Sequence, residues 1–229
     1  SGTDFTYALG EASDSDHASF SINQVTGELS FKAQPDYETK SSYSITILST
    51  DEGGKTFAKT FSLSVTAHNE APTLTVPTGG SVTEDASTST ITGTLSGSDP
   101  ESDDLSYSVV GSTASSGSYT VAGTYGSLAL NASTGAYTYT LNNSSTAVNA
   151  LTASDSQTES FSVQVTDGTN TPAAQSLSFT IKGANDAPTI SVSGLTSIAE
   201  NSTNAVAATV TGTDPEDGSK TVNLSGSGR

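Results

Sequence analysis

Apolar and polar residues alternate in short runs along most of the chain, a pattern typical of half-buried β-strands. The alternation is regular over residues 43–48 and 161–165, and it recurs over residues 5–9. Acidic and glycine residues at 51–54 separate the 43–48 run from another at 56–66, which is the arrangement of a β-hairpin. Because no segment favours a helix, we predict an all-β protein.

The strand runs predict several small β-sandwiches. Residues 71–188 contain about seven short strands separated by turn residues, which is typical of an immunoglobulin-like sandwich. Residues 1–70 hold further strands, beginning at what would be the third strand of such a fold. Residues 189–229 hold two or three strands, including a loose alternation over 198–211, and are too short to bury a core alone. We therefore predict three parts: 1–70, 71–188 and 189–229.

One stretch occurs twice, and it marks the joints between these parts. The segment at 68–76 reads HNEAPTLTV, and the segment at 184–192 reads ANDAPTISV. Each copy contains an Asn-acid-Ala-Pro linker, which begins at Asn69 and at Asn185. Two further acidic features follow each copy: a strand-end glutamate, at Glu84 and Glu200, and an Asp-Pro-Glu loop, at 99–101 and 214–216. Repetition of this kind indicates stacked domains, and the acidic oxygens at each joint suggest calcium.

The charge balance limits the partners of the chain. It has 24 acidic and 7 basic residues, a formal net charge of −17, and no cysteine. Nucleic acids and anionic membrane surfaces are unfavourable partners, because both require clustered Lys and Arg. Excess carboxylates either repel one another or hold hard cations that prefer oxygen ligands. Disorder is the alternative for so acidic a chain, but the regular alternation argues against it.

Residues 1–70 resemble a cadherin repeat in the order and spacing of their motifs. The stretch FSINQVTGEL at 20–29 is followed by Asp36-Tyr37-Glu38, an alternating strand from Tyr43, and Thr50-Asp51. The linker resembles the cadherin motif Asp-x-Asn-Asp-Asn-Ala-Pro, with Ala67 at its first aspartate and Glu70 in place of its Asp-Asn pair. The resemblance implies cadherin-like β-sandwiches with Ca²⁺ at their joints, and residues 189–229 resemble the opening strands of a further such domain.

Residues 71–188 resemble a VCBS repeat, which is a module of large bacterial adhesins exported by type I secretion. The resemblance is carried by GTYGSLALN at 123–131, GAYTYTL at 135–141, AVNAL at 147–151, FSVQVTDG at 161–168 and GANDAP at 183–188. It implies a segment of an RTX-type adhesin, located outside the cell at the bacterial surface. No apolar run in the sequence approaches the ~20 residues of a membrane-spanning helix.

The cadherin resemblance and the expected strand directions assign the acidic residues to two joints. Linkers enter a sandwich at one end and leave at the other, so the strand-end glutamate and the acidic loop fall at opposite ends. The ligands expected at the first joint are Asp36, Glu38, Asn69, Glu70, Asp99, Glu101, Asp103 and Asp167, with Asp51 at the opposite end of the 1–70 segment. Those expected at the second joint are Glu84, Asn185, Asp186, Asp214, Glu216 and Asp217, with Asp155 and Glu159 as weaker candidates.

Other chemistry is less well supported by the sequence. His17 and His68 lie outside any zinc-binding spacing, no nucleophile motif follows a strand, and paired carboxylates at domain joints do not form the cleft of a glycosidase. The expected partners are neighbouring repeats of the same adhesin. One hypothesis is head-to-tail strand complementation, in which residues 189–229 of one chain complete the 1–70 segment of another. The alternative hypothesis is that the sequence is an arbitrary excerpt of a longer protein.

These observations predict a non-enzymatic, calcium-stabilised structural segment of a bacterial adhesin. The alternative is a module of the same adhesin that itself binds a peptide or a carbohydrate. A concave pocket would favour the alternative, whereas calcium saturated by joint residues would favour the structural segment.

Overall fold

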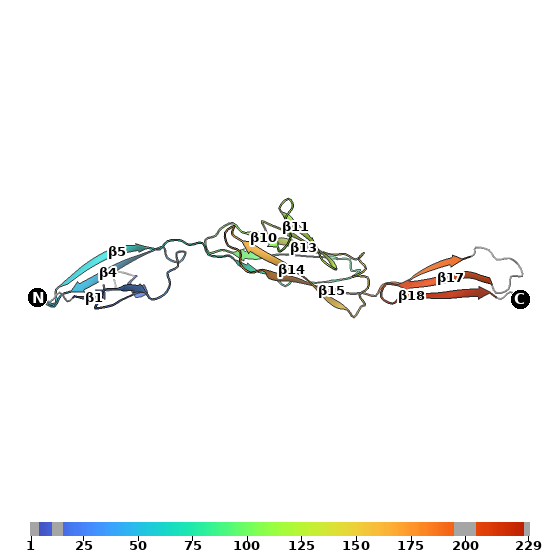
Figure 1. Ribbon diagram of the computed structural model, residues 1–229, viewed down its shortest axis with the longest axis horizontal. Coiled ribbons are helices and arrows are strands. Elements are labelled where there is room, and N and C mark those ends of the chain that lie inside the picture. Colours follow the sequence, from blue (N-terminus) through green and yellow to red (C-terminus); the bar gives the residue numbers. More distant parts are fainter. Residues whose placement is uncertain (1–4, 11–15, 195–204, 227–229) are drawn as a thin grey trace. The chain divides into compact units, whose positions relative to one another are not determined.

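The computed structural model describes residues 5–10, 16–194 and 205–226. Within the last of these ranges, side chains are described for residues 209–219. The chain divides into two compact units, Ser1–Glu70 and Ala71–Arg229 (Figure 1). The described residues form strands and one short 3-10 helix, so the predicted all-β fold is confirmed. Among these residues, no helix has the length and apolar character needed to cross a membrane.

The first unit combines a three-stranded antiparallel sheet with a short hairpin. The sheet has the order β1-β4-β5 and the hairpin is β2-β3. The bounds are β1 (Thr6–Leu9), η1 (His17–Ser19), β2 (Phe20–Ile22), β3 (Leu29–Phe31), β4 (Ser42–Thr50) and β5 (Thr56–Ser64). The predicted alternation places Tyr43 and Ile45 of β4 on the buried face with Phe20. The rings of Phe20 and Tyr43 meet edge to face with centroids 5.4 Å apart.

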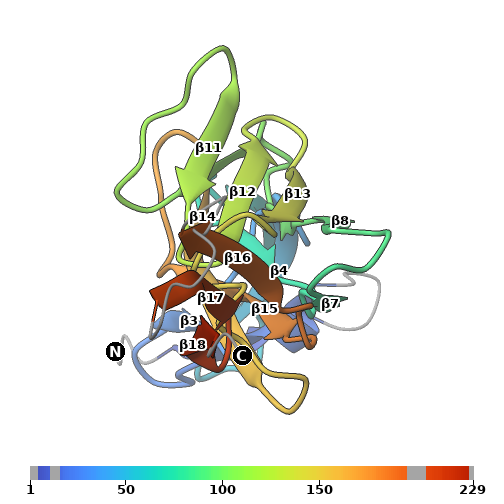
Figure 2. The ribbon, with the colours of Figure 1, turned by 90° about the vertical axis from the view of Figure 1, so that its right-hand side faces the viewer.

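The second unit contains a β-sandwich of two four-stranded sheets. One sheet has the order β10-β14-β15-β7 and the other β11-β12-β13-β8, whose strands β11, β12 and β13 lie side by side in Figure 2. A short pair, β6-β9, accompanies them. The bounds are β6 (Thr73–Thr75), β7 (Ser81–Thr83), β8 (Thr90–Thr94), β9 (Ser96–Ser98), β10 (Ser106–Val109), β11 (Ser118–Ala122), β12 (Gly126–Asn131), β13 (Ala136–Leu141), β14 (Ser156–Thr166) and β15 (Gln175–Lys182). Among these pairs only β7 and β15 run parallel.

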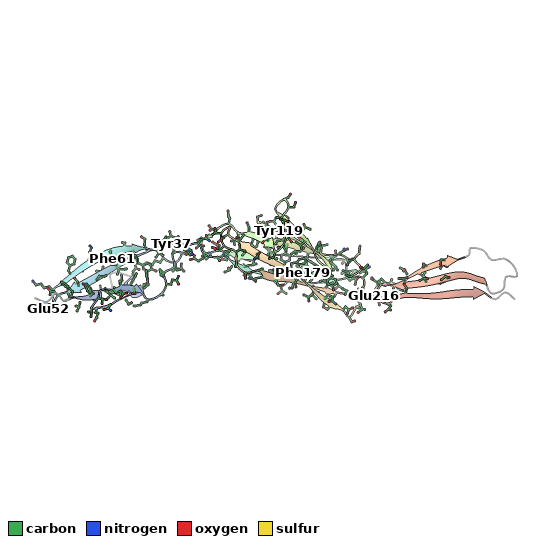
Figure 3. The ribbon with its side chains drawn as sticks, viewed as in Figure 1. Tyr37, Glu52, Phe61, Tyr119, Phe179 and Glu216 are labelled. Carbon is green, nitrogen blue, oxygen red and sulfur yellow. The ribbon has the colours of Figure 1, made fainter. Side chains whose placement is uncertain are left out.

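The core of the sandwich follows from the period of two in its strands. In β14, Phe161, Val163 and Val165 are buried, while Ser162 between them is exposed and Gln164 is half-buried. Phe179 of β15 stacks on Tyr139 of β13 with ring centroids 4.4 Å apart, and Figure 3 labels it within the sandwich. This stacking joins the two sheets, because β13 and β15 belong to different sheets.

The second unit continues into a three-stranded antiparallel sheet of order β16-β17-β18. Its bounds are β16 (Thr189–Gly194), β17 (Ala205–Asp214) and β18 (Gly218–Gly226). The first part of the predicted alternation over 198–211, including Glu200, lies outside the described residues. The last part of this alternation belongs to β17. The division predicted between residues 188 and 189 stays a prediction.

Candidate metal centre

Glu84 is a carboxylate that the fold buries almost completely, with 2% of its surface exposed. It directly follows β7, and its N–H donates to the Lys182 carbonyl at the end of β15 at 2.9 Å. Its Oε2 accepts a long hydrogen bond of 3.3 Å from the Ala184 N–H. Its Oε1 is buried and has no hydrogen-bond partner among the described residues. A buried carboxylate oxygen without a donor is costly, so this position suits a bound cation.

Two further carboxylates of the second unit converge on Glu84. The Asp186 N–H donates to Glu216 Oε1 at 2.6 Å, which links the segment after β15 to the turn between β17 and β18. Figure 3 labels Glu216 on this turn. Asp186 Oδ2 and Glu216 Oε2 are also buried, and neither has a hydrogen-bond partner in the described part of the chain. Three segments distant in sequence therefore each present an unpaired buried oxygen.

The pKa values at this cluster report crowding of negative charge. Burial raises the pKa of Glu84, and the charges of Asp186, Asp85 and Glu216 raise it further. Burial also raises the pKa of Asp186, and the neighbouring carboxylates of Asp85, Glu216 and Asp214 raise it further. A divalent cation among these oxygens would reverse the effect, because it stabilises the ionised carboxylates.

Asp214 and Asn185 have supporting positions in the same cluster. Asp214 Oδ1 accepts the N–H groups of Glu216 at 3.2 Å and Asp217 at 3.1 Å, which closes the β17–β18 turn. The backbone hydrogen bond from Asp217 is the main cause that lowers the pKa of Asp214. The Asn185 Nδ2 donates to the Asp186 carbonyl at 2.8 Å, so this side chain orders the linker.

Asp85 is a member of the cluster that the sequence analysis missed. It has a positive φ of 54°, a left-handed conformation that aspartate tolerates better than most residues. Its carboxylate lies near that of Asp186 and raises the pKa of Asp186. The available signal was its place directly after Glu84, but nothing in the sequence indicates the change of backbone direction that brings it to Asp186.

The opposite end of the same sandwich gathers Asp99, Glu101, Asp103 and Asp167. These residues share one end because Ser106, at the start of β10, pairs with Thr166 at the end of β14. Asp99 Oδ1 accepts the N–H groups of Glu101 at 3.0 Å and Asp103 at 3.1 Å. Asp99 Oδ2 is buried without a hydrogen-bond partner among the described residues. Asp99 Oδ2 is therefore an unpaired oxygen of the kind found at Glu84.

Asp167 uses both oxygens of its carboxylate within its own turn. Its Oδ1 accepts the N–H groups of Thr169 at 2.6 Å and Asn170 at 2.5 Å, which shapes the loop between β14 and β15. Its Oδ2 accepts a longer hydrogen bond of 3.5 Å from Asn170 Nδ2, so both oxygens of this carboxylate take part in the turn.

The predicted ligands of the first unit lie at both of its ends. Asp36 and Glu38 precede β4, and Asn69 and Glu70 follow β5. Both segments lie at one end of the sheet because Ser42 pairs with Ser64. Asp51 lies at the opposite end, in the β4–β5 turn, where its Oδ1 accepts the Lys55 N–H at 2.8 Å.

Asp36 also has a local role, since it accepts hydrogen bonds from the Thr39 N–H at 3.0 Å and the Thr39 hydroxyl at 2.9 Å. The backbone hydrogen bond from Thr39 is the main cause that lowers the pKa of Asp36. The Asn69 Nδ2 donates to the Glu70 carbonyl at 3.2 Å, as Asn185 does in the second copy of the linker.

The weaker candidates Asp155 and Glu159 are engaged elsewhere. Asp155 Oδ2 accepts the Thr152 N–H at 2.8 Å and closes the turn before β14. Glu159 points into the sandwich, where Tyr139 and backbone N–H groups take up both of its oxygens.

The donor set around Glu84 consists of carboxylate oxygens from three segments. Oxygen donors without thiolate or imidazole fit a hard cation such as Ca²⁺, and they do not fit zinc. Calcium accepts six to eight oxygens with loose geometry, which suits ligands drawn from separate segments. The residues present therefore pass the chemical test for a calcium site.

Comparison with known proteins identifies the family of the chain. Residues 69–183, half of the chain, match the model of the bacterial cadherin-like domain. The chain is similar in structure to extracellular cadherin domains 3–6 of protocadherin gamma B2, with 20% identity, a TM-score of 0.52, and coverage of 96% of this chain and 49% of that one. It is also similar to the extracellular domain of protocadherin gamma B4, with 19% identity, a TM-score of 0.50, and coverage of 96% and 32%. The chain spans half or less of the length of these structures, and at such identities the likeness shows the fold alone. On the family match, the chain belongs to the bacterial cadherin-like domain family.

Proposed function

We propose that this chain is a structural segment of a large bacterial cell-surface adhesin, in which Ca²⁺ at the domain joints stiffens a row of β-sandwiches. The family is of an extracellular adhesion type, and the net charge of −17 fits a protein that binds divalent cations. The VCBS resemblance of residues 71–188 extends the proposal to an RTX-type adhesin exported by type I secretion. The work of the segment is mechanical: it extends a fibre that presents a binding domain elsewhere.

The observation that carries the proposal is the set of unpaired oxygens on Glu84, Asp186 and Glu216. A folded protein pairs nearly all buried polar atoms, so three unpaired carboxylate oxygens in one cluster point to a missing partner. Acidic turns alone would not support this conclusion, because solvated carboxylates need no partner.

In the proposed site, Glu84, Asp186 and Glu216 would bind Ca²⁺ directly, and Asp85 and Asp214 would complete or orient the set. The cation supplies positive charge that offsets carboxylate repulsion. Without it, each pair of carboxylates about 5 Å apart repels by about 0.8 kcal/mol in water, and by more where the dielectric constant is lower. Binding would fix the β17–β18 turn against the end of the sandwich, because Glu216 lies on that turn and Glu84 on the sandwich.

A second calcium position is proposed for the joint that follows residue 70. Its ligands would come from Asp36, Glu38, Asn69 and Glu70 on one side and from Asp99, Glu101, Asp103 and Asp167 on the other. The unpaired Oδ2 of Asp99 supports this assignment. Affinities of the extracellular class, roughly 10⁻⁴–10⁻³ M, would leave such sites filled outside the cell and empty in the cytosol.

Calcium titration of the ion-stripped chain by isothermal calorimetry tests the proposal, with small-angle X-ray scattering of both forms. We expect saturable binding of Ca²⁺. We also expect the scattering to give a larger maximum dimension and a narrower range of conformations with Ca²⁺ than with chelator. Unchanged scattering together with no binding heat at millimolar Ca²⁺ would refute it. Head-to-tail complementation between chains stays a separate prediction, which analytical ultracentrifugation over a range of protein concentrations can decide.

A further inference from the structure

Strand β14 is longer than the strand that covers its outer edge. On one side, β15 pairs with β14 from Ser156 to Val163. On the other, β10 pairs only from Val163 to Thr166, and the Val110 N–H donates to the Ser162 carbonyl at 2.9 Å just beyond. In the described part of the chain, no strand is registered against the remaining residues of this edge. About half of β14 is thus an open edge inside an otherwise complete sandwich.

The direction of the backbone groups along this edge follows from Ser162. Its carbonyl faces β10, and in a strand the N–H and C=O of every second residue face the same side. The N–H and C=O groups of Ser160 and Thr158 therefore face the open side. The short distance of 2.8 Å between Ser160 Oγ and Ser178 Oγ agrees, because side chains approach most closely in pairs that do not exchange backbone hydrogen bonds.

A pocket of about 490 Å³ runs along this open edge. Residues 158–162 form one wall. The end of β10 at Val109 and Val110, and residues 121–125 at the β11–β12 turn, form the rest. Its volume falls within the range of small ligand sites. Val110 is 47% exposed, so an apolar side chain could be buried against it. Lys and Pro are the residues that commonly block strand addition at a sheet edge. The two edge positions here are Thr158 and Ser160 instead.

We propose that this edge binds an extended peptide segment free of acidic side chains, which adds to β14 as a further strand. Backbone hydrogen bonds to Thr158 and Ser160 would hold the segment, and Val110 and Val121 would receive one of its side chains. The end of β10 and the β11–β12 turn bound the pocket, which leaves room for a few residues of single chain and not for the edge of a second sandwich.

Charge decides the kind of peptide. Glu159 is the charged residue among those that line the pocket, and it forms no ion pair with any described residue. It is 7% exposed and accepts hydrogen bonds from the Tyr139 hydroxyl and the Tyr125 N–H. This charge, with the net charge of −17, repels acidic side chains and attracts basic ones.

Two capped hexapeptides, TVTKVT and TVTEVT, test the proposal against the calcium-loaded ¹⁵N-labelled chain. Amide exchange is measured by NMR at millimolar peptide. We expect TVTKVT to slow exchange at Thr158 and Ser160 by about tenfold, with little change at other exposed amides. TVTEVT should bind several-fold more weakly. Failure of TVTKVT to protect these two amides would overturn the proposal, and so would equal binding of the two peptides.

N-methylation of the peptide separates strand addition from simple contact. Two forms of TVTKVT are made, methylated at either the odd or the even backbone nitrogens. Because one set of N–H groups faces β14 and the other faces solvent, one form should lose binding and the other should keep it. Equal effects of both forms would exclude strand pairing. Protection of Thr158 and Ser160 that rises with protein concentration in the absence of peptide would identify a second copy as the occupant and overturn the proposal.

Discussion

Tyr139 donates a hydrogen bond of 2.7 Å to Glu159 Oε2 and so joins the two sheets of the sandwich through a buried carboxylate. Tyr139 is fully buried and Glu159 is 7% exposed. The other oxygen of Glu159 accepts the N–H groups of Thr124 and Tyr125, at 3.0 Å from the latter. Burial, followed by the hydrogen bond and charge of Glu159, raises the pKa of Tyr139 far above its usual value. Hydrogen bonding of both oxygens gives this carboxylate a structural role.

Tyr139→Phe should destabilise the sandwich. It removes one donor from a buried charge, and hydrogen bonds to charged groups contribute about 1.5–3 kcal/mol. For a unit of this size, such a loss corresponds to a fall in Tm of roughly 5 °C by differential scanning calorimetry. Tyr119→Phe, at a half-buried tyrosine of β11 in the same sheet, is the matched control and should change Tm little. Equal shifts in the two variants would contradict the role assigned to the Tyr139 hydroxyl.

Gly123→Ala should destabilise the same site from the other side. A Cβ at position 123 would lie within 2.7 Å of the carboxylate of Glu159, which is held by three hydrogen bonds and cannot retreat easily. We expect a loss of about 1–3 kcal/mol in urea unfolding, as for other overpacked sites. Gly53→Ala is the control, because its added Cβ would meet only Asp51 Oδ1, at 3.3 Å, in an exposed turn. An unchanged free energy of unfolding in Gly123→Ala would mean that the β11–β12 turn can move to accommodate the added methyl group, and would contradict this prediction.

Glu84→Gln should change the stability of the two calcium states in opposite directions. The variant removes a negative charge from a crowded cluster, so the ion-stripped form should be as stable as the parent or more stable. It also removes a proposed ligand, so calcium affinity should fall by about tenfold or more. Calorimetric titration and melts with and without Ca²⁺ measure both effects. Glu28→Gln, at an exposed turn of the first unit, is the control with the same charge change. Unaltered calcium affinity in Glu84→Gln would exclude Glu84 as a ligand.

The raised pKa values of Glu84 and Asp186 predict a pH dependence of the ion-stripped chain. A carboxyl whose pKa is higher in the folded than in the unfolded state binds more protons when folded. Its stabilising contribution is therefore complete below the unfolded pKa and is lost as the pH rises through the folded pKa. We expect these two groups to lower the stability of the second unit from about pH 4.5 upward. Saturating Ca²⁺ should remove this loss, and Glu84→Gln should reduce it.

Thermal melts of ion-stripped protein across this range, with and without added Ca²⁺, measure the effect. A calcium-independent profile would show that these carboxylates do not bind the ion. A profile that rises with pH in the ion-stripped chain would contradict the charge crowding assigned to Glu84 and Asp186.

The sequence predicted the strands well where one face of a sheet is apolar and the other is polar. Tyr43 and Ile45 in β4 and Phe161, Val163 and Val165 in β14 are buried as their alternation requires. The acidic repeats also predicted that Glu84, Asp186 and Glu216 belong to one joint, since chain direction alone sorts them to one end.

Two residues show where the sequence was insufficient. Asp85 reads as an ordinary polar residue after a strand, and only its left-handed backbone brings it to Asp186. Glu159 reads as a joint ligand, because a carboxylate at an alternating position gives no sign of the Tyr139 hydroxyl that receives it from the other sheet.

The sequence by itself determined the all-β fold and the acidic character of the repeated segments, because these depend on local periodicity and on residue type. The tertiary structure decided which carboxylate oxygens lack a partner and where the edge of β14 stays open. Those properties depend on which strands and turns meet across long separations in the chain, and local residue patterns carry no record of such distances.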